Sequence, residues 1–236
     1  MSKLIAVTGA SRGIGRAIAQ KFASAGFDIV ACARKIGDLQ TLKSDLEREF
    51  SISVHIHSAD LSDKIQAQAF ARFVVSLQRP IDVLVNNAGL FVSGDLSTEP
   101  DGNLETMIGA NLYSAYHVTR GIVDTMKRQR SGHIFNMCSI ASLTAYPNGG
   151  SYAISKFALL GFSRCLREEL KPFGIKVTSV MPGATWTDSW MGSGLPEDRF
   201  IPAVDIAEAV FSAYNVAPST VVEDLVIRPM LGDIHD

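Results

Sequence analysis

The chain has 236 residues, of which 47% are hydrophobic, and its formal net charge is -2 at pH 7. This length and composition fit one α/β domain with a substantial core, so we expect residues 1–236 to form a single domain. The weak net charge offers no basic surface to nucleic acid or an anionic membrane, so we expect neither partner. Apolar runs stay below 18 residues and the three Cys are widely spaced, which predicts a cytoplasmic protein without disulfides.

Short apolar segments alternate with longer amphipathic segments along the chain. Apolar runs bounded by turn residues predict buried strands at 4–9, 28–33, 53–60, 81–89, 133–139, 175–183 and 224–229. The intervening apolar periodicity predicts helices over 15–26, 64–77, 103–128 and 151–170, and a polar helix ending at Glu49. Strands that are apolar on both faces and separated by helices are typical of a parallel sheet covered on both sides. We therefore predict an α/β fold with a doubly wound parallel sheet of about seven strands.

The segment TGASRGIG at 8–15 directly follows the first strand and opens the first helix. Gly9 allows a tight turn, Gly13 lets the backbone approach a pyrophosphate, and Gly15 permits close packing of the helix on the strand. The helix N-terminus presents free amides and the positive end of the helix dipole to phosphates. Glycines also mark turns that bind nothing, but the strand–turn–helix context predicts a dinucleotide site.

The end of the second strand indicates which dinucleotide binds. An NAD site usually carries an acid there, whereas this chain has Arg34 and Lys35 at that point and Arg12 in the Gly-rich turn. Guanidinium groups suit the 2′-phosphate of NADP(H), so we expect NADP(H) rather than NAD(H). The alternative is that Arg34 and Lys35 are solvated charges at a strand end.

The segment SYAISKFALLGF at 151–162 places Tyr152 and Lys156 one helical turn apart, on the same helix face. An ammonium beside a phenol favours the phenolate, so we expect the pKa of Tyr152 to lie below its usual value. Tyr152 would then donate and accept a proton near neutral pH. Such a pair also arises by chance, so it needs support from other motifs.

Several motifs in register make the chain resemble the short-chain dehydrogenases and reductases of about 250 residues, which share one Rossmann-type domain. They are TGASRGIG at 8–15, NNAG at 86–89, Asn111 in GANLYSAY, Ser139 in IFNMCSIAS, YAISK at 152–156 and PGATWT at 182–187. The resemblance covers essentially the whole chain. It implies a single Rossmann-type domain and hydride transfer between a nicotinamide cofactor and a small substrate.

The resemblance also implies roles for the matching residues. Tyr152 would be the acid/base residue, and Lys156 would lower its pKa and hydrogen-bond the nicotinamide ribose. Ser139 would hydrogen-bond the substrate oxygen, with Ser142 as a competing candidate. Asn111 would hold a water between Lys156 and solvent, or would instead cap or kink its helix. The further cofactor contacts would be Gly9, Ser11, Arg12, Gly13, Ile14, Gly15, Arg34, Asp60, Leu61, Asn87, Gly89, Pro182, Gly183 and Thr187.

Substrate contacts are expected around the irregular segment 186–202, which we predict to be a lid. Its aromatic and sulfur-containing side chains suit a planar, aromatic or acyl-chain carbonyl compound, unless they only pack the lid onto the domain. The candidate contacts are Phe91, Ser139, Tyr146, Tyr152, Trp186, Trp190, Met191 and Phe200.

The substrate itself has two candidates. The tail STVVEDLVIRPMLGDI and the step PGATWTDSW resemble the sepiapterin-reductase branch, which reduces side-chain ketones on pterins with NADPH. That branch anchors the pterin through an acid near the cleft, and Asp188, Glu197 and Asp198 are available. The alternative is a 3-oxoacyl-carrier-protein reductase, whose acidic carrier would dock on Arg128 and Arg130.

Other interpretations are weaker. A non-catalytic, nucleotide-sensing regulator is a remote alternative, because the chain keeps both the Tyr and the Lys of the catalytic pair. His55 and His57 alternate on one strand without a Cys or carboxylate cluster, so no metal site is predicted. Cys138 is expected to be a small buried residue rather than a nucleophile. The resemblance implies a homodimer or homotetramer that pairs the helices 103–128 and 151–170.

Overall fold

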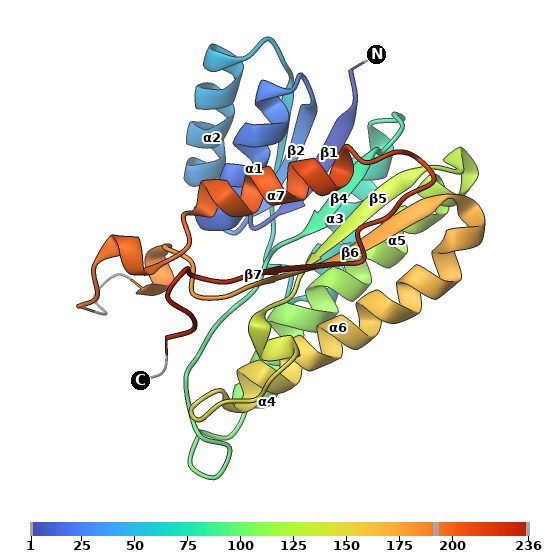
Figure 1. The fold of residues 1–236 in the computed structure, drawn as a ribbon. Coiled ribbons are helices and arrows are strands. Elements are labelled where there is room, and N and C mark those ends of the chain that lie inside the picture. Colours follow the sequence, from blue (N-terminus) through green and yellow to red (C-terminus); the bar gives the residue numbers. More distant parts are fainter. Residues whose placement is uncertain (1, 191–193, 235–236) are drawn as a thin grey trace.

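The computed structural model describes residues 2–190 and 194–234. Within these residues, seven parallel strands form one sheet in the order β3-β2-β1-β4-β5-β6-β7 (Figure 1). The strand order reverses at β1 and β4, and open α/β sheets bind ligands beyond the carboxyl ends of their strands at such a point. The strands are β1 Leu4–Thr8, β2 Asp28–Ala33, β3 Val54–Ser58, β4 Val83–Asn86, β5 Gly132–Met137, β6 Ile175–Pro182 and β7 Asp224–Ile227.

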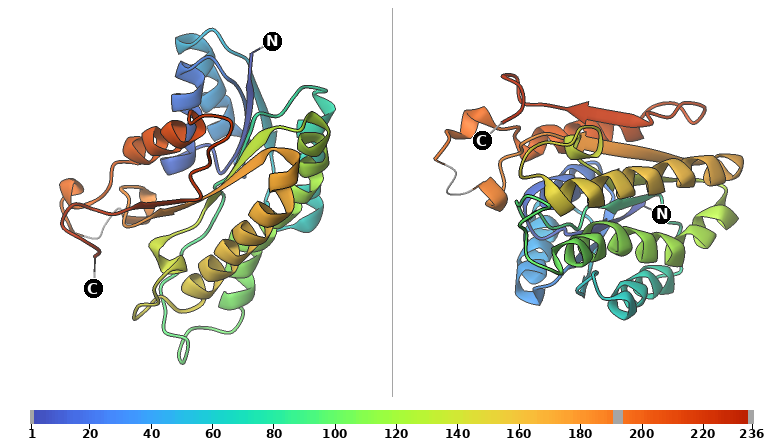
Figure 2. Two further views of the ribbon diagram at one scale, coloured as in Figure 1. Left: turned by 45° about the vertical axis from the view of Figure 1, so that its right-hand side comes forward. Right: turned by 90° about the horizontal axis from the view of Figure 1, so that it is seen from below.

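Helices cover both faces of this sheet (Figures 1 and 2). One layer contains α1, α2 and α7, and the opposite layer contains α3, α5 and α6. None of the described helices is both long and apolar enough to cross a bilayer. The α-helices are α1 Gly13–Ser24, α2 Ile36–Glu49, α3 Lys64–Ser76, α4 Asn103–Ile108, α5 Ser114–Gln129, α6 Gly150–Leu170 and α7 Ala203–Tyr214.

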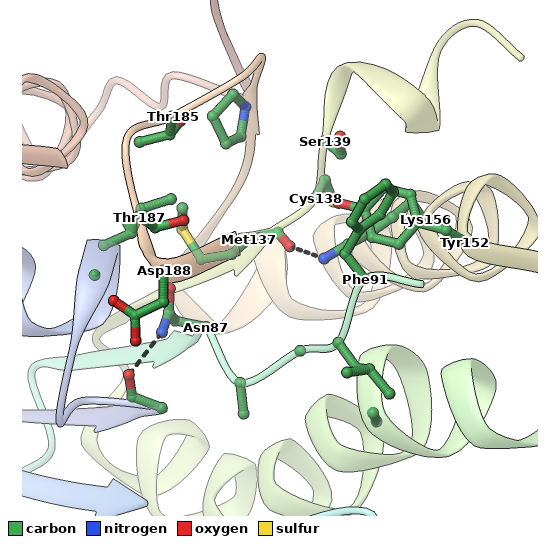
Figure 3. A pocket seen from close by; sticks show the side chains of 18 of the residues that line it. Asn87, Phe91, Met137, Cys138, Ser139, Tyr152, Lys156, Thr185, Thr187 and Asp188 are labelled. Atoms are coloured by element: carbon green, nitrogen blue, oxygen red, sulfur yellow. Dashed lines mark hydrogen bonds between the residues drawn. The ribbon is translucent and has the colours of Figure 1, made fainter. Parts of the chain in front are cut away.

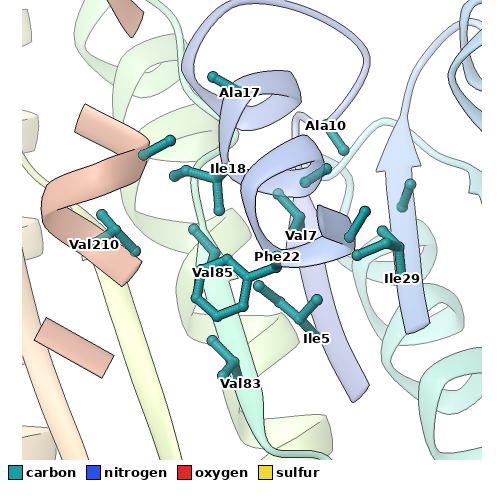
Figure 4. Packing of buried hydrophobic residues seen from close by; sticks show 14 of the residues in the cluster. Ile5, Val7, Ala10, Ala17, Ile18, Phe22, Ile29, Val83, Val85 and Val210 are labelled. Carbon is teal, nitrogen blue, oxygen red and sulfur yellow. The ribbon is translucent and has the colours of Figure 1, made fainter. Parts of the chain in front are cut away.

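The apolar run of β1 serves two cores at once. Ile5 and Val7 point to the layer of α1 and α7, where they pack around the fully buried ring of Phe22 (Figure 4). Leu4 and Ala6 point to the opposite layer. Because successive side chains of a strand alternate between its faces, a strand buried on both faces needs an unbroken apolar run. The predicted doubly wound, single-domain Rossmann-type fold is confirmed.

Some element boundaries differ from the prediction. Strand β4 ends at Asn86 rather than at residue 89, because Asn87 leaves the sheet and binds Thr8. The predicted helix 103–128 is divided into α4 and α5 by a π-helical turn, Gly109–Tyr113, which contains Asn111. Helix α7 was not predicted, although its buried residues follow a helical period.

Candidate functional site

A cleft of about 1420 Å³ lies beyond the carboxyl ends of the strands (Figure 3). Segments that follow all seven strands contribute to its wall. The predicted site residues on this wall are Gly9, Ser11, Arg12, Gly13, Ile14, Arg34, Asp60, Leu61, Asn87, Gly89, Phe91, Ser139, Tyr146, Tyr152, Lys156, Pro182, Gly183, Thr187 and Trp190. Four others, Gly15, Asn111, Trp186 and Phe200, are not among the residues that line it.

The glycine positions of the Gly-rich turn do not accommodate a side chain. Gly9 and Gly13 have φ values of +64° and +53°, which a residue with a Cβ rarely adopts. A Cβ on Gly15 would lie 2.3 Å from the carbonyl oxygen of Gly9 and 2.5 Å from Asn87 Nδ2. Gly15 therefore packs the start of α1 directly against the end of β1, as predicted, beneath the cleft wall.

Charged side chains gather where β1, β2 and β3 end. Arg34 and Lys35 are exposed on the cleft wall, next to Asp38, an acid that the sequence analysis did not single out. Hydrogen bonds from Ser62 lower the pKa of Asp60, and the charge of Arg34 lowers it further. Arg12 Nη1 lies 2.8 Å from Asp188 Oδ2, so an ion pair connects the Gly-rich turn with the segment that follows β6.

The opposite end of the cleft holds Tyr152 and Lys156, near the start of α6 (Figure 3). Lys156 Nζ donates to the carbonyl oxygen of Met137 at 2.8 Å and lies 5.7 Å from the Tyr152 ring centroid. Burial lowers the pKa of Lys156 to about 8. Burial raises the pKa of Tyr152, although a hydrogen bond with Ser139 opposes this. The prediction of a lowered Tyr152 pKa is wrong, because removal from water disfavours the phenolate.

Ser139 and Ser142 occupy different positions. Ser139 is on the cleft wall and caps a short 3₁₀ helix, its Oγ accepting from the amide of Ala141 at 3.1 Å. Ser142 is buried below it, and its Oγ accepts from the amide of Ser139 at 3.2 Å. Of the two serines, only Ser139 offers its hydroxyl to the cleft.

The Asn111 side chain is fully engaged by the protein. Its Oδ1 accepts from the amide of Leu90 at 2.7 Å, and its Nδ2 donates to the Leu90 carbonyl oxygen at 2.9 Å. Nδ2 also donates to Ser155 Oγ at 2.8 Å. The π-helical turn thus fixes the loop after β4 to α6, and the role of Asn111 in holding a water stays a prediction.

Aromatic residues surround the Tyr152 end of the cleft. The ring of Phe91 meets the Tyr152 ring edge-on, with centroids 4.8 Å apart, and Tyr146 and Trp190 also line the cleft. Trp190 and Trp186 both pack on the buried ring of Phe200, each with centroids 5.1 Å apart, but Trp186 does not line the cleft. Part of the segment 186–202 therefore packs onto the domain, and Met191 lies outside the described residues.

Comparison with known proteins identifies the family. A family model for short chain dehydrogenase matches residues 3–197. The chain belongs to this family. Sepiapterin reductase of Chlorobaculum tepidum is 33% identical to it over 247 residues, with 100% of both chains covered.

Two solved structures of oxidoreductases are similar to this short-chain dehydrogenase over their whole length. An alcohol dehydrogenase of the archaeon Thermococcus sibiricus, complexed with 5-hydroxy-NADP, superposes with a TM-score of 0.91 at 28% identity and 100% coverage of both chains. A metagenomic short-chain oxidoreductase in complex with NADP has a TM-score of 0.84 at 31% identity, over 97% of each chain. The predicted family membership is confirmed.

The sequence analysis also missed an acid in the C-terminal tail of this short-chain dehydrogenase. Asp233, in the C-terminal tail, lines the cleft together with Arg228, with which it forms an ion pair. Its Oδ1 is buried and has no hydrogen-bond partner among the described residues. Arg199 donates to the carbonyl oxygens of Gly232 and Asp233 at 2.9 and 3.0 Å, which connects the segment 186–202 to the tail. Glu197, suggested earlier as an anchor, is not among the cleft-lining residues, and neither is Asp198.

Two residue sets were set aside in the sequence analysis, and one of them, Cys138, lies on the cleft wall. Within residues 2–190 and 194–234, no three His, Cys, Asp or Glu side chains gather as metal ligands, and His55 and His57 carry no such cluster. Cys138 is buried, and burial raises the pKa of its thiol to about 11, which disfavours the nucleophilic thiolate.

Proposed function

We propose that this short-chain dehydrogenase is an NADP(H)-dependent oxidoreductase that reduces a carbonyl to an alcohol on a small, planar or apolar substrate. One observation carries the proposal: a single cleft joins the Gly-rich turn and its arginines to Tyr152, Lys156 and Ser139. A dinucleotide with its phosphates at the turn would extend toward Tyr152, where the substrate would meet it.

The chain's residues fit NADP(H). The glycines of the turn leave space for a pyrophosphate at the N-terminus of α1, and Arg12 and Arg34 are placed to receive a 2′-phosphate. The two similar structures that carry NADP or its 5-hydroxy derivative support this assignment. Thr187, whose Cγ2 would lie 3.2 Å from a Cβ on Gly13, would face the phosphates or the carboxamide. When bound, the nicotinamide supplies the hydride.

The protein residues would handle the proton and the developing charge. A raised pKa keeps the Tyr152 phenol protonated at neutral pH, which is the form that gives a proton to a carbonyl oxygen during reduction. Ser139 would hydrogen-bond the same oxygen and stabilise its charge as hydride reaches the carbon. Lys156, held by the Met137 carbonyl, would favour the phenolate that remains and would bind the nicotinamide ribose.

For the substrate we propose a pterin side-chain ketone. Sepiapterin reductase is a full-length relative, and the aromatic side chains of Phe91, Tyr146 and Trp190 would contact a planar ring. Asp233 supports the assignment because a buried, unpaired carboxylate oxygen favours a ligand that brings N–H donors, as the pterin ring does. Both Asp233 and Asp188 form an ion pair with an arginine, but the Asp233 side chain is 20% exposed and that of Asp188 is 55% exposed, so we assign the acidic anchor to Asp233.

A 3-oxoacyl-carrier-protein reductase remains the alternative, but the proposed carrier-docking residues do not support it. Arg128 and Arg130 lie just before β5, at the end of the sheet opposite the cleft. A strand of this length spans about 20 Å, so a carrier docked there would hold its acyl chain far from Tyr152. The alternative would need another docking surface.

NADPH consumption tests the proposal. Sepiapterin, acetoacetyl thioesters, aromatic diketones and simple aldehydes would be compared as substrates, with wild type and Tyr152→Phe side by side. We expect sepiapterin to be reduced fastest and Tyr152→Phe to lose nearly all turnover while it still binds NADPH. A Tyr152→Phe variant with wild-type turnover would refute the mechanism. Preference for the thioester would favour the alternative, and NADPH binding without any turnover would favour a nucleotide sensor.

We further propose that the chain forms a homodimer or homotetramer through α5 and α6. Ile154 and Phe157 lie one turn apart on α6 and are 40% and 44% exposed, so they form an exposed apolar pair on this helix. Pairing of these faces between two copies would bury them. Analytical ultracentrifugation would distinguish the dimer from the tetramer, and a monomer at micromolar concentration would contradict the proposal.

A further inference from the structure

The loop after β4 is fixed to the loop that leads into α6. These loops lie side by side at one end of the molecule (Figures 1 and 2). The amide of Gly94 donates to the carbonyl oxygen of Asn148 at 3.0 Å, and Ser93 Oγ donates to the same oxygen at 3.2 Å. In return, the amide of Asn148 donates to Asp95 Oδ1 at 3.1 Å. We call residues 91–99 the clasp loop.

Glu99, at the end of the clasp loop, reaches the first turn of α6. Its Oε1 accepts a hydrogen bond from Ser151 Oγ, and Ser151 is only 1% exposed. Its Oε2 is buried and accepts no hydrogen bond from the described residues. A Cβ on Gly150 would lie 3.1 Å from Oε2 and 2.2 Å from the carbonyl oxygen of Gly94, so the loop approaches the helix more closely than any residue but glycine allows.

Helix α6 has no side-chain cap of its own, and the Glu99 carboxylate lies beside its first turn. The N-cap residue of α6 is Gly149, which has no side chain to bind the free amides of the first turn. A negative charge at a helix N-terminus is stabilised by the helix dipole. The Glu99 carboxylate lies at this end of α6, where it accepts from the Ser151 hydroxyl and belongs to a loop 52 residues earlier in the chain.

The first turn of α6 is the one that carries Tyr152. Helix α6 begins at Gly150, so Tyr152 is its third residue and directly follows Ser151. Terminal helix turns open more readily than helix interiors, and opening here would displace the phenol. The clasp loop also contacts Tyr152 at its other end, where the Phe91 ring packs edge-on against the phenol ring. One end of the loop thus contacts the Tyr152 side chain, and the other end contacts Ser151, the residue before it.

We propose that Glu99 is a positioning residue for Tyr152, and that it acts through Ser151 on the first turn of α6. This inference rests on the proposed function, because it assumes that the position of the Tyr152 phenol governs the rate of proton transfer. Small displacements of a reacting group cost large factors in rate. We therefore expect Glu99→Ala to lower the single-turnover rate of NADPH oxidation about tenfold or more, with little change in NADPH affinity.

Three variants and one control test the inference. Glu99→Ala removes the carboxylate, Glu99→Gln keeps an acceptor without the charge, and Ser151→Ala removes the hydroxyl. The control is Glu169→Ala, which removes an exposed carboxylate from the same helix. Single-turnover rates would be measured with the carbonyl compound that the wild type reduces fastest. Hydrogen exchange of the peptide 150–156 would be followed in parallel, since it needs no activity.

We expect Glu99→Ala to speed hydrogen exchange at 150–156 and to slow the single turnover, while Glu99→Gln recovers most of the rate. Ser151→Ala should reproduce the loss, and the double variant should be no slower than Glu99→Ala alone, because both act through one contact. Unchanged exchange and rate in Glu99→Ala would overturn the inference. So would a loss that follows NADPH affinity or the folded fraction, because Glu99 would then be merely structural.

The outcomes separate this inference from the proposed function. If Tyr152→Phe is inactive and Glu99→Ala turns over like the wild type, only the positioning role fails. If Tyr152→Phe keeps its activity, the proposed mechanism fails, whereas hydrogen exchange at 150–156 still reports whether Glu99 holds the first turn of α6. If Glu99→Ala does not fold, Ser151→Ala, which removes one oxygen atom, tests the same contact.

Discussion

Replacement of Lys156 by methionine should stabilise the protein while removing its activity. Lys156 is 6% exposed, and burial lowers its pKa from 10.5 to about 8. A shift of this size corresponds to about 3 kcal/mol of destabilisation of the charged form in the folded state. Methionine has a similar unbranched shape and carries no charge, so the variant avoids this cost.

The variant also loses the hydrogen bond from Lys156 Nζ to the Met137 carbonyl oxygen. A hydrogen bond from a charged donor contributes about 1.5 to 3 kcal/mol, so about 1 kcal/mol of net stabilisation remains at pH 7. The gain depends on pH. Below pH 8 the lysine is charged in both the folded and unfolded states, and the wild type bears the full cost. Between pH 8 and 10.5 the unfolded state holds a proton that the folded state lacks, so the wild type gains stability and the difference shrinks.

Urea unfolding of wild type and Lys156→Met at pH 7, 8, 9 and 10 measures this difference. The protein concentration is held constant, because subunit association changes apparent stability. Effects of other titrating groups cancel in the comparison at each pH. A variant that is less stable than the wild type at pH 7, by an amount that does not change up to pH 10, would refute the argument. A confirmed gain would mean that the site keeps a buried charge at the expense of stability.

Two other substitutions test the cofactor end of the cleft. Arg34→Ala should weaken NADPH binding by about tenfold or more, since a guanidinium–phosphate contact contributes about 1.5 to 3 kcal/mol, and should change NADH binding little. Fluorescence titrations with the two cofactors measure both affinities. Equal losses of affinity for NADPH and NADH would contradict the 2′-phosphate assignment. Gly15→Ala places a Cβ 2.3 Å from the Gly9 carbonyl oxygen, so the turn must shift. We expect it to cost about 1 to 3 kcal/mol in urea unfolding and to abolish NADPH binding, and wild-type affinity would show that the turn tolerates a side chain.

The sequence predicted what depends on local spacing. The fold followed from apolar runs such as β1, and the Gly-rich turn followed from its place between strand and helix. The direction of the pKa shift of Tyr152 could not be predicted, because it depends on burial by distant segments rather than on the lysine one turn away. Asp233 and Glu99 escaped notice for the same reason. Nothing local distinguishes either acid from an exposed one until the tail and the clasp loop are folded onto the cleft.

The sheet order has a consequence for how the site is assembled and held together. The Gly-rich turn belongs to the half built from β1, β2 and β3, whereas Tyr152 and Lys156 belong to the half built from β4 onward. The halves meet where β1 pairs with β4, through the register pairs Ile5↔Val83, Ala6↔Leu84 and Val7↔Val85. A dinucleotide lying in the cleft would cross this junction and so brace the two halves against separation. Its binding free energy would then add to the cooperativity of unfolding, and proteolysis between the halves should slow as the NADPH concentration rises.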